Sequence, residues 1–240
     1  MQDIPWQITV PTPPPGSWLP LATGAIAVLT TIVTVLPRVG WTRRAVFGLN
    51  VVGTLAHEAG HAAAGIITGG GVITIRVHTP HSGVTHSWHY SRISAVVVKF
   101  AGYATPPLAG YGAASLLARG HAPMVLALTV AVLGLVLIVS RGVVTVASVL
   151  AVGLLAWVAA ALSPLWVQHW VAYTETWLLL CSEITGVWFL VHNRIRGDVG
   201  STDDAAGLAR LTGVPGVVWI AVWTALIGWT LWHAVPLLWP

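Results

Sequence analysis

The sequence predicts an all-α polytopic membrane protein with about seven transmembrane helices and a small β-hairpin. Its composition favours this class, since 56% of the 240 residues are hydrophobic and only 8% are charged, whereas soluble domains carry about 25% charged residues. The chain also contains a series of apolar segments of about 20 residues, the length that crosses a hydrocarbon core of roughly 30 Å. Because little sequence lies between these segments, we expect one membrane-embedded domain over residues 17–240. Residues 1–16 are rich in proline and are predicted to be a disordered lead-in.

Seven apolar segments account for the predicted transmembrane helices. They are residues 17–36, 45–68, 93–118, 122–140, 143–163, 169–192 and 214–238. Arg141 and Gly142 separate the fourth segment from the fifth. The loop arginines favour neither orientation clearly, since the larger group and the first short loop point to opposite sides.

The polar interval at residues 71–91 predicts the β-hairpin. Two runs rich in β-branched and aromatic residues, 72–78 and 84–90, flank a turn signal at residues 80–83. An isolated two-stranded hairpin is marginally stable, so we expect it to lean on the helices. Four histidines lie in this interval at spacings that match no strong zinc signature, and we expect them to be solvated. They are His78, His81, His86 and His89.

Charge and cysteine content exclude some classes of partner and bond. The formal charge of +4 is spread over short loops, which argues against a nucleic-acid partner. Cys181 is the single cysteine of the chain, so no internal disulfide can form. The lipid bilayer is the partner that the composition itself implies.

The residues most indicative of function lie inside the second apolar segment, where residues 57–61 read His-Glu-Ala-Gly-His. On a helix, His57 and His61 point the same way, so both imidazoles can reach one metal ion. Glu58 is offset from them and can reach a metal-bound water while staying outside the ligand set. A chance polar patch is the alternative, but burying such groups in hydrocarbon is costly, about 2.5–3.5 kcal/mol for a charged residue at a helix centre. We therefore predict a catalytic Zn²⁺ site with Glu58 as general base.

Two other apolar segments contain polar or helix-breaking residues. Pro106 and Pro107 in the segment 93–118 free carbonyl groups one turn upstream, so exposed backbone there could hold a substrate, with Tyr103 donating a hydrogen bond to an oxyanion. A kink at a helix crossing and a packed tyrosine are the alternatives. Glu175 and Glu183 lie in the segment 169–192. Either could orient a zinc-bound histidine, or could be protonated and bonded to backbone.

Together these motifs resemble the site-2 protease family of intramembrane zinc metalloproteases, in particular its compact bacterial branch without extra domains. The resemblance rests on the His57–His61 motif, the polar segment after it, the Gly/Pro-interrupted run at residues 101–107 and the run Asp204–Ala209, and it covers residues 45–213. It implies a multi-pass protein of the bacterial plasma membrane that cleaves peptide bonds within or near transmembrane segments of other membrane proteins. The hairpin would lie at the entrance to the active site, where its free edge could pair with an extended substrate strand; a plain connecting hairpin is the alternative. The Asn-x-x-Pro element and intramembrane Asp-Gly pair of better-known members do not occur in this sequence.

The third zinc ligand is predicted to be Asp204. The helix at residues 57–61 supplies two ligands, and a catalytic zinc usually has three protein ligands and a water. Asp198, Asp203 and Asp204 lie in the polar stretch between the last two apolar segments. Asp203 suits the N-cap of the short helix that follows, whereas Asp204 matches by resemblance the ligand position ahead of the two alanines. Asp203 remains the first alternative, and the intramembrane glutamates come after both.

Two other functions fit parts of the sequence. A membrane transporter could use the buried glutamates as an ion path, and a non-catalytic relative could act as a membrane scaffold. We find no internal repeat of the kind that transporters commonly show, and the two histidines and Glu58, which an inactive relative would be expected to lose, are present. A zinc metalloendopeptidase acting on a membrane-protein substrate is therefore the preferred interpretation. The sequence determines neither the substrate nor the oligomeric state.

Overall fold

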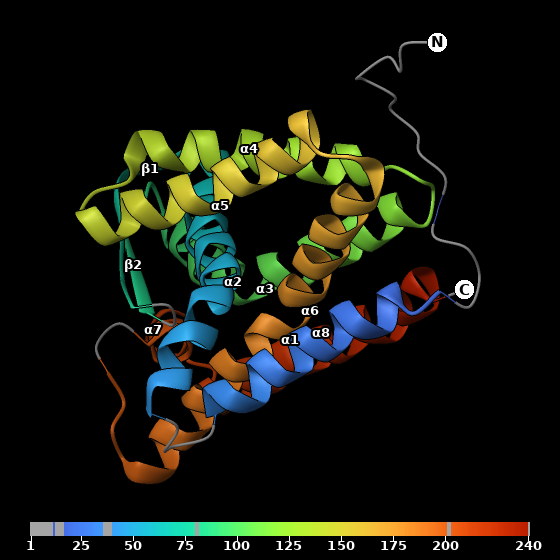
Figure 1. The fold of residues 1–240 in the computed structure, drawn as a ribbon. Helices are drawn as coiled ribbons and strands as arrows, with labels where there is room; N and C mark the ends of the chain where they lie inside the picture. The colour runs from blue at the N-terminus through green and yellow to red at the C-terminus, as the bar shows by residue number, and fades with distance from the viewer. Residues whose placement is uncertain (1–11, 13–16, 36–39, 80–81, 201–202, 240) are drawn as a thin grey trace.

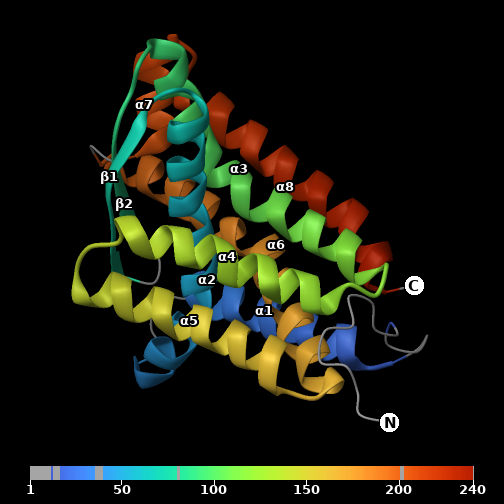
Figure 2. The ribbon, with the colours of Figure 1, turned by 90° about the horizontal axis from the view of Figure 1, so that it is seen from above.

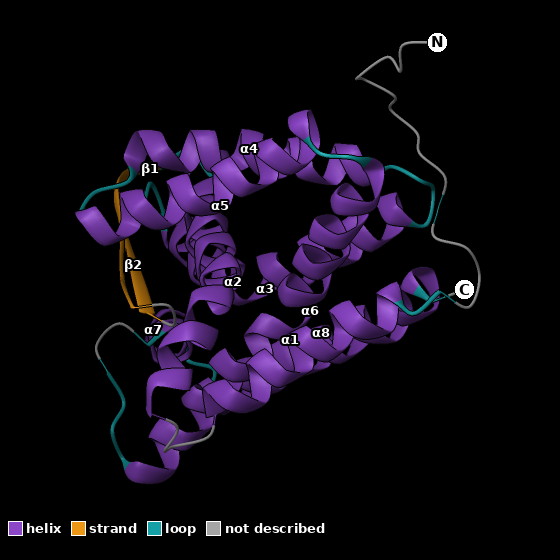
Figure 3. Ribbon diagram, viewed as in Figure 1, coloured by secondary structure: helices purple, strands orange, loops and turns teal. Residues whose placement is uncertain are grey.

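The computed structural model describes residues 12, 17–35, 40–79, 82–200 and 203–239, and this part of the chain is almost entirely helical (Figure 3). Its elements, in chain order, are α1 (Leu19–Val35), α2 (Gly40–Ile67), β1 (Gly71–Thr79), β2 (Ser82–Trp88), α3 (Arg92–Leu117), α4 (Ala122–Val139), α5 (Val143–Leu162), α6 (Leu165–Arg196), α7 (Asp204–Thr212) and α8 (Gly216–Leu238). Each predicted apolar segment forms a helix, and the predicted hairpin is present. The proposed lead-in lies outside the described residues except for Thr12.

The predicted number of seven membrane spans is not confirmed. Among the described helices, α4, α5 and α8 are long and apolar enough to cross a membrane, and α1 is apolar but has only 17 residues. Helices α2, α3 and α6 are longer, at 28, 26 and 32 residues, but do not meet the same criterion. Their sequences contain charged and polar residues, among them Glu58, Lys99 and Glu183. Composition and length thus support a membrane protein with three candidate spans.

Helices α2, α3 and α6 pack against one another in the middle of the molecule, and the other helices flank them. Figures 1 and 2 both show α4 and α5 side by side along one flank. Helix α8 runs along α3, as Figure 2 shows, and α1 packs on α6. The hairpin lies at one end of this bundle, next to α2 and the ends of α4 and α5.

The hairpin is antiparallel and is anchored to the helices through β1. The amide of Arg141, in the turn between α4 and α5, donates to the Ile75 carbonyl at 2.9 Å, and the Val77 amide donates to Thr145 Oγ1 at 2.9 Å. Ile75 is fully buried, so β1 also contributes to the apolar core between α2, α4 and α5. This attachment provides the support that an isolated hairpin lacks. The edge of β1 that does not pair with β2 is bonded to residues of the α4–α5 turn and of α5. The outer edge of the hairpin on the opposite side therefore belongs to β2.

Helix α3 continues through the two prolines, contrary to the expectation of an interrupted span. Pro106 and Pro107 lie inside the helix and both are buried. Neighbouring helices can accommodate the backbone groups that a proline leaves unpaired, and α2, α6 and α8 all pack on α3. The prolines therefore lie in a packed, continuous helix.

Candidate functional site

Helix α2 places His57 and His61 one turn apart on the face that packs on α3. Their Nε2 atoms are 3.1 Å apart. His61 is buried, and the His57 side chain is 16% exposed. The four-residue spacing thus brings the two imidazole nitrogens to one point, as expected for a helix.

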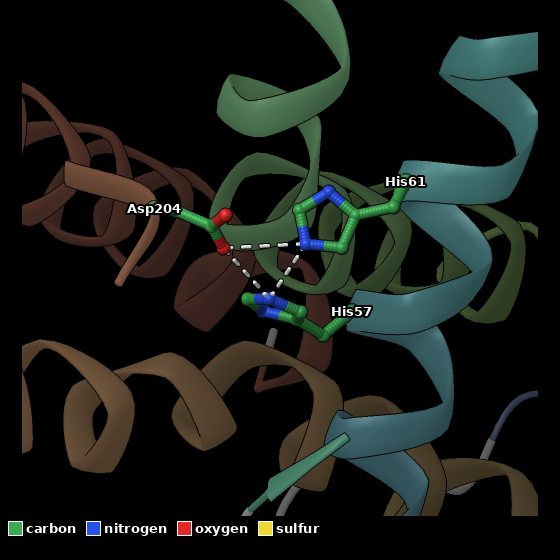
Figure 4. A group of neighbouring side chains, drawn as sticks. All are labelled: His57, His61 and Asp204. Atoms are coloured by element: carbon green, nitrogen blue, oxygen red, sulfur yellow. Dashed lines mark hydrogen bonds and ion pairs between the residues drawn. The ribbon is translucent and has the colours of Figure 1, made fainter. Parts of the chain in front are cut away.

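Asp204, the first residue of α7, joins the two imidazoles from the far end of the sequence (Figure 4). Its Oδ2 atom lies 3.3 Å from His61 Nε2 and 3.5 Å from His57 Nε2. The three side chains form a group that could hold a metal ion. A tetrahedral zinc with bonds of about 2.0–2.1 Å would have its ligand atoms about 3.3–3.4 Å apart. The donor set and its spacing therefore fit a zinc ion.

The other nitrogen of each imidazole has a fixed partner. His61 Nδ1 lies 2.7 Å from the Val98 carbonyl, which can only accept, so this nitrogen carries the proton. His57 Nδ1 lies 3.2 Å from Glu183 Oε1. Such partners orient a metal-binding histidine and leave Nε2 free for the metal. Of the two glutamates in α6, Glu183 therefore belongs to the site.

Glu175, by contrast, lies away from the metal group. Its carboxyl group is hydrogen-bonded to the Thr129 hydroxyl of α4. Both Glu175 and Glu183 are buried, and the sequence alone left their roles open. In the structure, Glu183 contacts His57, whereas Glu175 contacts Thr129.

The two neighbouring aspartates at the start of α7 have different partners. Asp203 accepts from the Ala206 amide at 2.8 Å as the N-cap of α7, and its two oxygens pair with Arg194 at 2.8 and 3.0 Å. Asp204 instead faces the imidazoles through Oδ2 and Lys99 through Oδ1, which is 3.1 Å from Nζ. Burial raises the pKa of the Asp204 carboxyl, but the His61 and His57 imidazoles outweigh that effect and hold the pKa well below its usual range.

Glu58 lies beside the metal group and is covered by the hairpin. It is 2% exposed, and the Thr85 hydroxyl of β2 donates to its Oε2 atom. A Cβ atom at Gly83 would lie 2.4 Å from Glu58 Oε1. Only a glycine therefore lets β2 approach the carboxylate this closely.

Two cavities border the site, and His57, Glu58, Gly83 and Asp204 line both. The first, which we call the α6-side cavity, has a volume of about 360 Å³ and reaches along α6 past Ser182, Glu183, Thr185 and Asn193. The second, the hairpin-side cavity, has a volume of about 300 Å³ and is lined by Val84, Thr85, His86, Ser87, His89 and Lys99. The metal group and Glu58 are thus accessible to water or substrate from two sides.

Helix α3 approaches the metal group through Gly102. A Cβ atom at this position would lie 2.5 Å from His61 Nε2 and 2.6 Å from His57 Nε2. Any side chain there would occupy the space between α3 and the imidazoles. In the sequence, Gly102 belongs to the run at residues 101–107 and permits a close approach between helices; the structure places it beside both histidines.

The three residues proposed to contact substrate are placed differently from one another. The Tyr103 ring packs edge-on against His57, with centroids 4.7 Å apart, and lines the α6-side cavity. Pro106 and Pro107 are buried farther along α3 and line neither cavity. The structure therefore brings Tyr103 to the site and does not bring the prolines there.

Three residues near the site were missed in the sequence: Lys99, Thr85 and Val98. Lys99 had a usable signal, because it is the only lysine of the chain and lies within a predicted span. Thr85 and the Val98 carbonyl had no such sequence signal, since their roles depend on how β2 and α3 pack.

Of the hairpin histidines, His86 and His89 line the hairpin-side cavity, while the His78 side chain and His81 lie outside the described residues. Within the described part of the chain, the metal group of His57, His61 and Asp204 includes neither His86 nor His89.

Comparison with known proteins gives one match. A family model described as Peptidase M50B-like matches residues 25–234, which is most of the chain and includes every residue of the metal group. No curated protein and no solved structure matches the sequence.

Proposed function

The chain belongs to the Peptidase M50B-like family, part of the site-2 protease family, and from this premise we propose that it is an intramembrane zinc metalloprotease. The observation that carries the proposal is the meeting of His57, His61 and Asp204 with Glu58 beside them. We propose that the enzyme hydrolyses peptide bonds within or near transmembrane segments of membrane proteins. We further propose that it is a multi-pass protein of a bacterial plasma membrane, as the resemblance to the compact bacterial branch implies.

In this proposal, His57 Nε2, His61 Nε2 and Asp204 Oδ2 would hold the zinc. Three protein ligands leave one position for water, which is the arrangement of catalytic zinc sites. Zinc, when bound, acts as a Lewis acid and lowers the pKa of a coordinated water towards about 7. Glu183 and the Val98 carbonyl hold the two imidazoles in the tautomer that directs Nε2 to the metal.

Glu58 is the proposed general base. It borders both cavities next to His57 and Asp204, so it can take a proton from a water there and pass it to the amine that leaves. The Thr85 hydroxyl holds one carboxylate oxygen in place. Proton transfer by a positioned side chain contributes about 10²–10⁴-fold to a rate.

The substrate is proposed to enter the hairpin-side cavity as an extended strand beside β2. Five consecutive residues of β2, Gly83–Ser87, line this cavity, while β1 is attached to the turn between α4 and α5. Strand addition to a free sheet edge would expose the substrate backbone that a helix shields. The geometry therefore favours β2 as the docking edge.

Metal content and cleavage, measured together, test this function. We expect about one zinc per chain in the wild type, the same in Glu58→Gln, and none in His57→Ala, since that change removes a ligand. On a panel of single-span model substrates in vesicles, only the wild type should cleave, because an amide at position 58 cannot take a proton. Equal zinc in wild type and His57→Ala would refute the metal site. Zinc without cleavage by the wild type would favour the membrane scaffold.

A further inference from the structure

Lys99 is the only lysine in the chain, and its charge lies against a proposed zinc ligand. It occurs in α3, and its Nζ atom is 3.1 Å from Asp204 Oδ1. A charged side chain within an apolar segment is costly and usually has a partner with a functional use. The partner here is the carboxylate that faces the two imidazoles.

The two oxygens of Asp204 have different neighbours. Oδ2 lies 3.3 and 3.5 Å from the Nε2 atoms of His61 and His57. Oδ1 is the oxygen that Lys99 contacts. A carboxylate can bind a metal through one oxygen or through two, and the ammonium group is placed on the oxygen that does not face the imidazoles.

We propose that Lys99 is a positioning residue that keeps Asp204 a single-oxygen ligand and so holds the number of protein ligand atoms on the metal at three. This inference rests on the proposed zinc site. With Oδ1 bonded to the ammonium group, the protein supplies three ligand atoms, and the fourth position stays available to water. Without Lys99, Oδ1 could also bind the metal, in addition to the water, and raise the number of metal ligands to five.

Packing holds Lys99 in place against the same short helix that carries Asp204. A Cβ atom at Gly207, one turn after Asp204 in α7, would lie 2.6 Å from Lys99 Cδ and Cε. The lysine stem thus lies directly on the backbone of α7. The Lys99 side chain is 30% exposed and lines the hairpin-side cavity, so its charge borders the space proposed for substrate.

The alternative is that the ion pair between Lys99 and Asp204 only stabilises the packing of α7 on α3. Metal spectroscopy distinguishes this role from an effect on metal coordination. A positive charge near the metal repels it, so removing Lys99 should not weaken metal binding if the residue acts on coordination. The full-length protein in detergent is loaded with zinc or with cobalt(II), as wild type, Lys99→Met and Lys99→Arg. For each protein we would measure the amount of bound metal and the rate of cleavage. The coordination of the metal would be followed by visible absorption of the cobalt form and X-ray absorption of the zinc form.

We expect Lys99→Met to keep about one metal ion per chain with an extra carboxylate oxygen bound to it. The cobalt form should therefore absorb more weakly than the wild type, as five-coordinate cobalt does relative to four-coordinate. Cleavage should fall roughly 10–100-fold, the usual effect of removing a group that orients a metal ligand. Lys99→Arg retains charge and donors and should restore the wild-type spectrum.

Arg194→Met is the matched control, because it breaks the neighbouring ion pair with Asp203 and leaves Asp204 untouched. It should lower thermal stability and leave the cobalt spectrum unchanged. A wild-type spectrum in Lys99→Met, or an altered one in Lys99→Arg, would overturn the inference. If Lys99→Met does not accumulate in folded form, Lys99→Gln is measured in the same way and must show the same change. A wild type without metal would instead refute the proposed function.

Discussion

The helices that hold the candidate metal site differ in composition and packing from the helices that flank them. Helices α4, α5 and α8 have the apolar composition of membrane spans, and most residues of their apolar stretches are not buried within the protein. Most of their residues are therefore left free to contact lipid. Helices α2, α3 and α6 carry the buried His61, Glu58 and Glu183 and the half-buried Lys99, and they pack on one another. Apolar composition thus identifies the lipid-facing flanks, while polar interruptions identify the centre where the site lies.

The two regions also pack differently. Helix α3 reaches the imidazoles at a glycine, Gly102, where no side chain fits. The α4–α5 flank is filled by larger apolar residues, Leu133, Val136 and Val149, which are buried against β1. Close backbone approach at the centre requires small residues, so we expect the centre to be far less tolerant of substitution.

The largest expected effect comes from adding one methyl group beside the site. Gly102→Ala should abolish zinc binding, because the new Cβ atom would lie 2.5 Å from His61 Nε2 and must displace the imidazoles. Gly112→Ala is the matched control on the same helix, since a Cβ atom there meets nothing within 4 Å. Metal analysis of both purified variants checks the prediction. Full zinc content in Gly102→Ala would mean that the packing of the central helices tolerates an added methyl group as readily as that of the flanking helices.

The two buried glutamates of α6 provide the next comparison. Glu183→Gln should weaken zinc binding about tenfold, the lower end of the effect of changing a partner of a metal ligand, because an amide lacks the charge that faces His57 Nδ1. Glu175→Gln should leave zinc affinity unchanged, since its partner is Thr129. Competition with a chelator of known affinity measures both. Equal losses in the two variants would show that α6 acts as a whole and not through Glu183.

A smaller effect is expected at the N-terminus of α7. Asp203→Ala removes the N-cap and the partner of Arg194, so it should cost about 0.5–2 kcal/mol of stability while zinc content stays at the wild-type level. Thermal unfolding in detergent and metal analysis report the two quantities separately. Loss of zinc with unchanged stability would assign the ligand role to Asp203 in place of Asp204.

Local sequence patterns predicted the helices and the motif on α2, because both depend on periodicity within one segment. The four-residue spacing of His57 and His61 is sufficient to bring their nitrogens together on a helix. Contacts between distant segments were not accessible in the same way. That Glu183 rather than Glu175 faces His57, and that Lys99 faces Asp204, depends on how α3, α6 and α7 pack.

Two expectations from the sequence, one contradicted by the structure and one not confirmed by it, have a common physical origin. Pro106 and Pro107 were expected to interrupt a helix, but α3 packs on α2, α6 and α8, among others, and continues through both. Seven spans were predicted from apolar length, and four of them are not confirmed: α2, α3 and α6 carry the polar residues that build the centre, and α1 is short. In both cases the sequence was read as isolated helices, whereas the tertiary packing of the centre determines the outcome.

The smallest effect is expected on the flank and completes the comparison. Gly134 in α4 is exposed, and a Cβ atom there meets nothing within 4 Å. Since glycine within a helix is less favourable than alanine by roughly 0.5–1 kcal/mol, Gly134→Ala should raise the thermal stability slightly and leave zinc content and cleavage unchanged. Thermal unfolding in detergent measures the shift, with Gly102→Ala as the contrasting variant. A loss of cleavage in Gly134→Ala would mean that the lipid-facing flank takes part in the function, because neither packing nor the metal group would account for it.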